Sequence, residues 1–345
     1  MRSVRSAVPL SGCALFLALF AAGCREAAPT LPDTPSVSSA ISASRISLEI
    51  FVDAATGDDA AGNGSAAFPF RTISRGLQAG SSGMTVTVRP GIYSPATGES
   101  FPLRLKDGLT LRGAAAETVT IDGAGAAVVL EDAPQARIEQ LTVRGGGQAG
   151  MVLGFSSTAA LCALRQNFRG VVCESSASVE DCLIENNSDT GIYIRGSAAP
   201  AVRRNVIRGN GGEGVECRED SAPLLRGNDI RENQKHGVVC TDSASPLLQE
   251  NTITQNVLPE VYVLFGARPT LSGNIIRDNA RYNIDDARSP GQGEISALGN
   301  TWNDPQPSGT ISGPADSRPN YFIKEAGNSI RFSGGAAAVR RRRLS

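Results

Sequence analysis

The sequence has few of the side chains that bind soft metal ions and no excess of either charge. Its 345 residues include one His and three Met, and its basic and acidic residues nearly balance at a net charge of −1. Copper and zinc sites favour imidazole and thioether ligands, so we expect no such metal cofactor. A balanced charge also disfavours nucleic acid as a partner, because nucleic-acid binding needs a basic surface.

Long hydrophobic runs are absent except for one close to the amino terminus. "AVPLSGCALFLALF" follows two arginines and precedes "AAGC", an order typical of an export signal peptide over residues 1–23. The run is too short to span a bilayer comfortably. Its end resembles a bacterial lipobox in which Cys24 becomes the lipidated first residue, although Ala21 stands where Leu is usual. Arg25, in place of an Asp, then indicates the outer membrane or cell surface of a Gram-negative bacterium; an ordinary secretory signal is the alternative.

The second half of the chain repeats with a period of 23 residues. Proline at one position and asparagine at two positions return at this step. A fixed period in this range indicates a solenoid, in which each unit buries its apolar face only against its neighbours. The three series are Pro200, Pro223, Pro246 and Pro269; Asn205, Asn228, Asn251 and Asn274; and Asn187, Asn210, Asn233, Asn256 and Asn279.

Within each repeat, short runs of alternating apolar residues are separated by Gly, Ser, Asp and Pro. This period of two predicts strands and turns, whereas no helical spacing persists across a repeat. Three strands per coil, each stacked on the same strand of the next coil, describe an all-β, right-handed parallel β-helix of roughly eight or nine coils. Stacked asparagines can hydrogen-bond along its axis. In one coil the predicted inward side chains are Val215, Cys217, Leu225, Asn228 and Ile230.

Composition divides the rest of the chain into four regions. Residues 24–47 are rich in Pro, Ser and Ala, which predicts a flexible tether. Residues 48–126 are expected to form an N-terminal cap and the first coils, and residues 127–332 the repeats with a C-terminal cap. Residues 333–345 include four consecutive arginines and predict a solvated basic tail, with contact to anionic lipid as the alternative.

The segment that precedes the regular repeats carries an ordered set of motifs. They are Val52–Asp53, Gly57, Asp59, Pro69–Ile73, Val88–Tyr93 and Glu99–Leu103. Their order resembles the domain-of-unknown-function family 1565, and with the repeats the likeness covers roughly residues 50–300. The resemblance implies a parallel β-helix and no assigned activity. Within the segment, Ile73 and Leu77 have helical spacing, which predicts a short helix over residues 72–79 that caps the open end of the solenoid.

Five of the seven cysteines follow the period at inward positions, where a free thiol acts as a small hydrophobic group. They are Cys162, Cys173, Cys182, Cys217 and Cys240. Inward positions are inaccessible to a substrate, so none of these thiols is expected to be catalytic. Cys162 with Cys182, and Cys217 with Cys240, would lie one strand spacing apart, and a disulfide in either pair stays open at this point.

Function must therefore depend on outward side chains, which the period identifies. The strand after the coil-start glycine presents Tyr beside Arg and Glu. This combination suits a saccharide, because aromatic faces pack on the sugar ring while charged groups bond its hydroxyls. An ordinary solvated sheet face is the alternative. The predicted ligand-binding residues are Tyr193, Arg195, Glu216, Arg218 and Tyr262.

The catalytic alternative is a polysaccharide lyase or glycoside hydrolase acting on acidic polysaccharide. Its candidate residues are Arg218, Glu216, Asp285, Asp286 and His236, and under the lyase alternative alone Ca²⁺ would be held by Asp53, Asp58 and Asp59. Arg218 and Asp285 lie three coils apart, about 14 Å at a strand spacing of ~4.8 Å, which is too far for one proton transfer. The sequence therefore predicts an envelope-anchored lipoprotein whose lateral sheet binds glycan or another cell-surface component without catalysis and without a cofactor. A structural or adhesive stalk is the remaining alternative.

Overall fold

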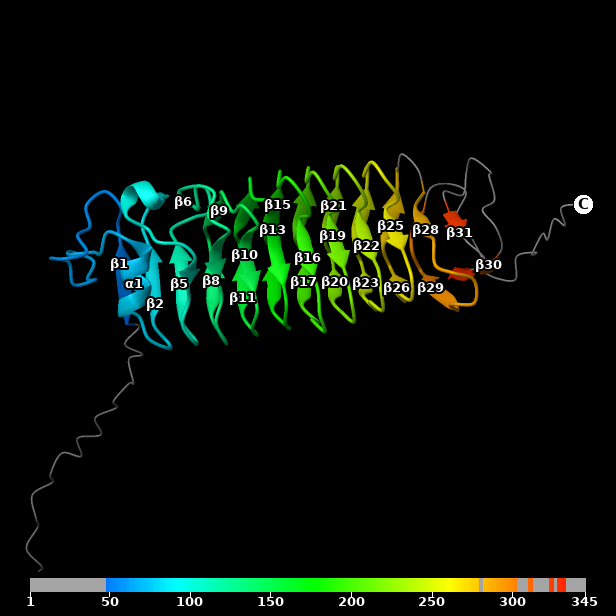
Figure 1. Ribbon diagram of the computed structural model, residues 1–345, viewed down its shortest axis with the longest axis horizontal. Helices are drawn as coiled ribbons and strands as arrows, with labels where there is room; N and C mark the ends of the chain where they lie inside the picture. The colour runs from blue at the N-terminus through cyan, green and yellow to red at the C-terminus, as the bar shows by residue number, and fades with distance from the viewer. Residues whose placement is uncertain (1–47, 279–281, 303–309, 313–322, 326–327, 333–345) are drawn as a thin grey trace, which may run out of the picture. The chain divides into compact units, whose positions relative to one another are not determined.

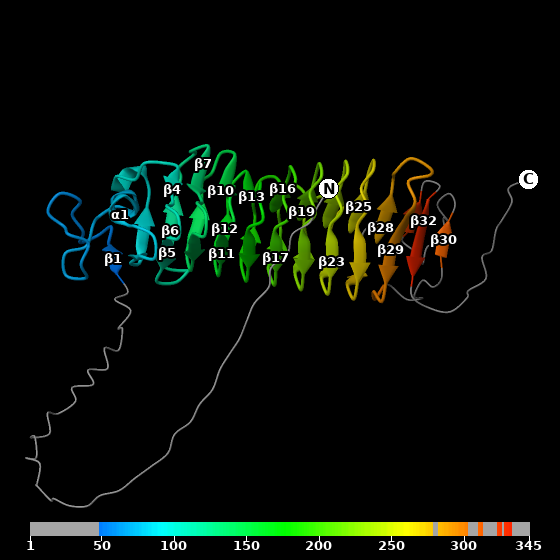
Figure 2. The ribbon, with the colours of Figure 1, turned by 90° about the horizontal axis from the view of Figure 1, so that it is seen from below.

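The computed structural model describes residues 48–278, 282–302, 310–312, 323–325 and 328–332. The predicted signal peptide, tether and basic tail lie outside these residues. Three sheets wrap around one core, and their strands succeed one another along the stack in chain order, except that β30 follows β32 (Figure 1 and, from below, Figure 2). Among the described strands every pair is parallel except β30 with β32. The prediction of an all-β, right-handed parallel β-helix is confirmed, and the nine-stranded sheet corresponds to about nine coils.

Each coil contributes one short strand to each sheet. The thirteen-stranded sheet contains, in spatial order, β1 (Glu49–Val52), β2 (Thr85–Val88), β5 (Thr110–Gly113), β8 (Arg137–Glu139), β11 (Thr158–Ala160), β14 (Ser178–Glu180), β17 (Ala201–Arg203), β20 (Leu224–Arg226), β23 (Leu247–Gln249), β26 (Thr270–Ser272), β29 (Glu294–Leu298), β32 (Ser329–Phe332) and β30 (Thr310–Ser312). The ten-stranded sheet contains β4 (Leu103–Arg104), β7 (Val128–Glu131), β10 (Ala149–Leu153), β13 (Arg169–Cys173), β16 (Ile192–Ile194), β19 (Val215–Cys217), β22 (Val238–Cys240), β25 (Val261–Val263), β28 (Ile284–Asp286) and β31 (Ile323–Glu325). The nine-stranded sheet contains β3 (Gly91–Tyr93), β6 (Val119–Asp122), β9 (Thr142–Arg144), β12 (Ala163–Arg165), β15 (Leu183–Glu185), β18 (Val206–Arg208), β21 (Asp229–Arg231), β24 (Thr252–Thr254) and β27 (Ile275–Arg277).

The core forms because alternate residues of every strand point inward and stack on their equivalents one coil away. All five side chains predicted to point inward in the coil of β19 are buried in the structure. Strand partners in successive coils are one repeat apart, as in the pairing of Val215 with Val238 and of Ile230 with Ile253. The 23-residue period is therefore the length of one coil, and it determines the register of all three sheets.

Two rows of buried asparagines connect the coils at two corners of the solenoid. In the first row, Asn205 Nδ2 donates to Asn228 Oδ1 at 3.0 Å, and Asn228 Nδ2 donates to Asn251 Oδ1 at 2.9 Å. The row continues through Asn274 to Asn300, a step of 26 residues that the period does not predict. We call this row the first ladder.

The second ladder begins at Asn167, one coil before its first predicted member. Its intermediate members repeat the same contacts, as in the bond of 2.9 Å from Asn233 Nδ2 to Asn256 Oδ1. At Asn256 the acceptor changes, because both its side-chain and its backbone N–H groups donate to the carboxyl group of Glu260. Asn279, the predicted next member, lies outside the described residues.

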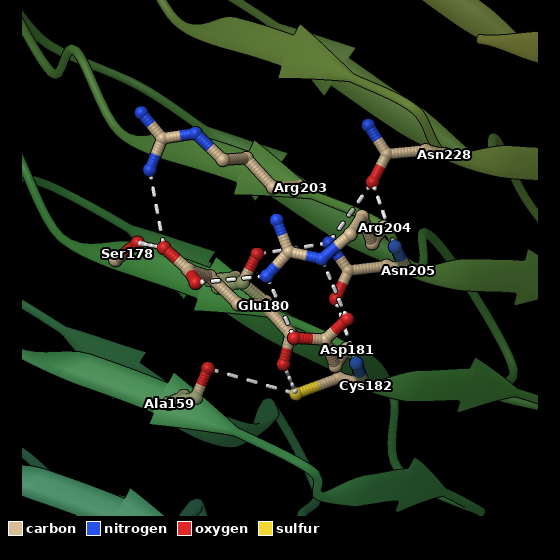
Figure 3. A network of polar contacts seen from close by, with 10 residues as sticks. Ala159, Ser178, Glu180, Asp181, Cys182, Arg203, Arg204, Asn205 and Asn228 are labelled. Carbon is tan, nitrogen blue, oxygen red and sulfur yellow. Dashed lines mark hydrogen bonds and ion pairs between the residues drawn. The ribbon is translucent and has the colours of Figure 1, made fainter.

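The five periodic cysteines are buried, as predicted. All five are free in the structure, so neither neighbouring pair is bridged. Burial raises the pKa of Cys173 to about 12, so this thiol is not a ready nucleophile. Cys182 takes the place of a first-ladder asparagine, and its backbone N–H donates to Asn205 Oδ1 at 2.9 Å (Figure 3).

One short helix, α1 (Ile73–Ala79), packs on β1, β2 and β4 near the start of the solenoid. Thr72 is its N-cap and accepts a hydrogen bond from Arg75 N at 3.1 Å. Ile73 and Leu77 are buried, as their spacing predicts. Gly76 permits the close approach, since a Cβ atom there would lie 2.7 Å from Val52 Cγ2. The part of the chain that the structure describes contains no helix long and apolar enough to cross a membrane.

Candidate functional site

The outer face of the ten-stranded sheet carries the side chains that the period places outward. Register pairs Tyr193 with Glu216, Glu216 with Val239, and Val239 with Tyr262. The strands that hold them, β16, β19, β22 and β25, lie side by side in Figure 1. Because successive residues of a strand point to opposite faces, these four side chains follow one line along the outside of the solenoid.

A hollow of about 240 Å³ lies on this face, and we call it the β19–β25 pocket. It brings together four of the residues that the sequence singles out, which are Glu216, Arg218, His236 and Tyr262. Three consecutive coils therefore contribute to one site. The complete lining is Glu213, Glu216, Arg218, His236, Val239, Thr241, Tyr262, Leu264 and Phe265.

The aromatic wall of the pocket is a stacked pair of rings from adjacent coils. His236, in the turn before β22, stacks on Tyr262 of β25 with ring centroids 4.6 Å apart and planes inclined by 5°. Phe265, in the turn after β25, is 62% exposed and lines the pocket as well. The pocket thus offers apolar ring surface beside ionisable groups, which is the usual composition of a small-ligand site.

Glu213 lies at the end of the turn before β19 and is the more acidic carboxyl of the pocket. Its Oε1 atom lies 3.4 Å from Lys235 Nζ and 3.7 Å from His236 Nδ1. Burial alone would raise its pKa, but the contacts with His236, its own backbone N–H and Lys235 lower it to about 2. Glu213 is therefore ionised at neutral pH.

Glu216 projects outward from β19, and its surroundings raise its pKa, whereas those of Glu213 lower the pKa of that residue. Burial raises its pKa, the negative charge of Glu213 raises it further, and Arg218 opposes the rise. Arg218 Nε lies 3.8 Å from Glu216 Oε1 and 3.6 Å from Asp242 Oδ2. Two carboxyl groups whose pKa values are shifted in opposite directions thus line the same pocket.

Two polar atoms of the pocket residues are buried without a hydrogen-bond partner. They are Arg218 Nε and His236 Nδ1. Leaving such an atom unpaired costs about 1–3 kcal/mol of folding stability. Buried polar atoms without partners are rare in folded proteins and often belong to sites with a function beyond folding.

The family described as "Protein of unknown function (DUF1565)" matches residues 55–308. The chain belongs to the DUF1565 family. No curated protein matches it.

Solved structures share the fold of this DUF1565 protein. Pectate lyase Pel9A has a TM-score of 0.60 at 13% identity, over 74% of this chain and 76% of the lyase. The A-module of mannuronan C-5 epimerase AlgE6 from Azotobacter vinelandii has a TM-score of 0.52 at 17% identity, over 76% and 90% of the two chains. Alginate lyase from Paenibacillus sp. str. FPU-7 has a TM-score of 0.51 at 13% identity, over 74% and 95%. At these identities the likeness shows the fold alone.

Two predicted ligand-binding residues of this DUF1565 protein lie outside the β19–β25 pocket. Tyr193 faces outward but is only 8% exposed, and the guanidinium carbon of Arg169 lies 4.1 Å from the centre of its ring. Arg195 donates from Nε to Glu174 at 2.9 Å, which occupies its guanidinium group. Of the two predicted ligand-binding tyrosines, Tyr262 lines the pocket and Tyr193 does not.

The two acidic residues of β28 lie on opposite faces of the sheet. Asp285 is buried on the outer face, one coil beyond Tyr262. Asp286 points into the core, where Arg288 Nε donates to its Oδ1 at 2.8 Å and both side chains are 0% exposed. The sequence-based suggestion of Asp286 as a catalytic residue is wrong, because a fully buried ion pair serves the core and cannot reach a substrate.

The candidate calcium ligands are used by the fold instead. Asp53 accepts from the backbone N–H groups of Ala55 and Thr56, and Asp58 accepts from those of Ala60 and Ala61. Likewise Asp59 accepts from the backbone N–H groups of the two residues before α1. Their oxygens do not converge, and no group of three or more metal-binding side chains occurs within the described residues.

Glu213 is the pocket residue that sequence reasoning missed. A signal for it was present, since Glu213 and His236 are 23 residues apart and both precede a coil-start glycine. Strand alternation does not connect them, because this position lies in the turn before each strand.

Proposed function

We propose that the outer face of the ten-stranded sheet binds a glycan, with the β19–β25 pocket as its central contact. The observation that carries this proposal is the grouping of the stacked Tyr262 and His236 rings with two carboxyl groups and a guanidinium group in one hollow. Ring faces pack on the apolar faces of sugars, and the charged groups fix orientation by bonding to hydroxyls. The named activities of the pectate lyase and alginate lyase structures, which share the fold, support a polysaccharide as the partner.

Acidic polysaccharide suits the pocket less well than uncharged glycan. Glu213 is ionised, Glu216 lies beside it, and Asp242 lies on the other side of Arg218. Each cation near the pocket already faces one of these carboxylates. Arg218, the one arginine or lysine among the described residues that line the pocket, already forms ion pairs with two carboxylates. A uronate chain would therefore bring further negative charge without meeting, among these residues, a cation that lacks a carboxylate, at an electrostatic cost.

The binding test uses the purified full-length protein on immobilised polysaccharides. We expect retention on at least one uncharged glycan, and at least a tenfold loss of affinity in Tyr262→Ala, since hot-spot aromatic residues contribute upward of about 1–2 kcal/mol. Phe155→Ala is the matched control, because Phe155 is an exposed aromatic residue on a coil remote from the pocket. Equal losses in both variants, or no retention on any glycan, would contradict the proposal.

We further propose a cellular location, a lipid anchor and an N-terminal cap for the protein. The chain is exported, Cys24 carries the lipid, and residues 24–47 hold the solenoid away from the outer membrane, while α1 covers its first coil. Metabolic labelling with a radioactive fatty acid tests the anchor: label should enter the wild-type protein and be absent from Cys24→Ser. A stalk without ligand is the competing function, and it predicts no glycan binding at all.

A further inference from the structure

The expectation of a non-catalytic surface depends on the distance between Arg218 and Asp285, which lie on different coils. Glu213 and Glu216 do not fit that expectation, because they lie three residues apart, on either side of the start of β19, and both line the β19–β25 pocket. Their side chains are largely buried, with exposed fractions of 13% and 18%. Glycoside hydrolysis uses two carboxyl groups that flank the scissile bond, and this hollow contains such a pair of side chains.

We propose that the β19–β25 pocket hydrolyses a glycosidic bond of an uncharged glycan, with Glu216 as the proton donor and Glu213 as the nucleophile. This inference rests on the proposed function, glycan binding at the same pocket. It adds a reaction, two catalytic residues and a substrate class.

The two carboxyl groups differ in the way that these roles need. Glu213 has Lys235 and His236 against it, which keep it ionised and able to attack an anomeric carbon. Glu216 is buried beside that negative charge, and both effects favour its protonated form. Environments that push two carboxyl pKa values apart identify an acid and a nucleophile in this chemistry.

The reaction balances without any further reagent than water. In the first step a Glu213 carboxylate oxygen bonds to the anomeric carbon, the glycosidic C–O bond breaks, and the Glu216 proton moves to the departing oxygen. In the second step Glu216, now a carboxylate, takes a proton from water as the water oxygen bonds to the same carbon. The ester bond to Glu213 breaks, both side chains return to their starting states, and the sugar keeps its configuration.

The other charged groups around Glu216 explain the choice of an uncharged substrate. Arg218 lies close to Glu216 and to Asp242. The charges of Arg169 and Asp189, from the two preceding coils, also act on the pKa of Glu216. Lys235 is committed to Glu213. A substrate carboxylate at the cleaved bond would raise the electrostatic cost of keeping Glu213 ionised, whereas hydroxyl groups would not.

The test measures new reducing ends with the full-length protein on laminarin, xylan, mannan and cellulose oligosaccharides, with alginate and polygalacturonate for comparison. We expect cleavage of at least one uncharged glycan. Glu216→Gln and Glu213→Gln should each lower the rate at least about 100-fold, the lower end of acid–base catalysis, with glycan affinity within a few fold of wild type. Glu117→Gln, exposed in the turn before β6 and remote from the pocket, should keep full activity.

A second measurement separates catalysis from folding. In Glu213→Ala, added azide should restore turnover by replacing the missing nucleophile, and the product should be a glycosyl azide of inverted configuration. Structural damage would not be repaired in this way. Inversion by the wild-type enzyme would overturn the role of Glu213, and cleavage of the acidic polymers alone would overturn the substrate class.

The outcomes also separate this inference from the proposed function. Retention on a glycan without any release of reducing ends would overturn hydrolysis and leave glycan binding intact. No retention on any glycan would count against both.

Discussion

Glu260 is a fully buried carboxyl group whose protonation should control the stability of the solenoid. It stands where the preceding coils have Gly214 and Gly237, and it accepts hydrogen bonds from Asn256 of the second ladder. Burial raises its pKa from 4.5 to about 8, and the bonds from Asn256 oppose this rise only in part. Asp278 adds to the rise by charge repulsion.

The sign of the effect follows from which state holds the proton. Between pH 4.5 and about 8 the folded chain keeps the Glu260 proton, whereas the unfolded chain has lost it. Stability therefore falls as pH rises through this window, by about 1.4 kcal/mol per pH unit. The contribution of Glu260 is close to zero below the lower limit, about 3 kcal/mol unfavourable at pH ~7, and about 5 kcal/mol unfavourable above the upper limit.

Glu260→Gln removes the titration, because glutamine stays neutral at every pH. Its NH2 group replaces one of the two oxygens that accept from Asn256, and the loss of that hydrogen bond is the same at every pH. Urea unfolding at intervals from about pH 5 to about 9 should show the variant gaining on the wild type as pH rises, with the gain levelling off above pH ~8. Glu117→Gln is the control, since Glu117 is exposed in the turn before β6. Parallel pH profiles for Glu260→Gln and the wild type would refute the reasoning.

Three further predictions follow from buried groups. Asn228→Ala removes both the donor and the acceptor that Asn228 contributes to the first ladder and should lower the free energy of unfolding by about 3 kcal/mol or more, measured by urea unfolding. Arg288→Ala should cost about 3–5 kcal/mol by leaving Asp286 charged and unpaired in the core, while Arg288→Met combined with Asp286→Leu should recover most of the loss in the same assay. The five periodic cysteines should react with Ellman's reagent only after unfolding, and a reading of fewer than five thiols from residues 48–332 would reveal a disulfide.

The period predicts which side chains point in and out, but exposure also depends on neighbouring side chains. Val215 and Ile230 are buried because side chains alternate inward and outward along each strand, and both residues occupy inward positions. Tyr193 obeys the same alternation and faces outward, yet the long Arg169 side chain from the next coil covers it. The repeat therefore predicts the positions of Cα atoms. The conformation of a flexible arginine side chain depends on the charges and rings around it, and these do not follow from the spacing of the repeat.

Single departures from the repeat were the parts that could not be predicted. Glu260 replaces a coil-start glycine, and its side chain takes the acceptor position of a ladder asparagine. Asp286 falls at an inward position and is tolerated because Arg288, two residues later, turns back to pair with it. Both substitutions break the apolar or small-residue rule for their position, and only the three-dimensional partners explain why the fold accepts them.

The two ladders tie the same coils together at two corners. In each ladder, side-chain hydrogen bonds join the coil of β19 to the coil before it and to the coil of β22. Since each coil contacts only its neighbours, separating two of these coils would break a bond at both corners at once. The β19–β25 pocket takes most of its side chains from these coils, so the two ladders hold these parts of the site at a fixed spacing.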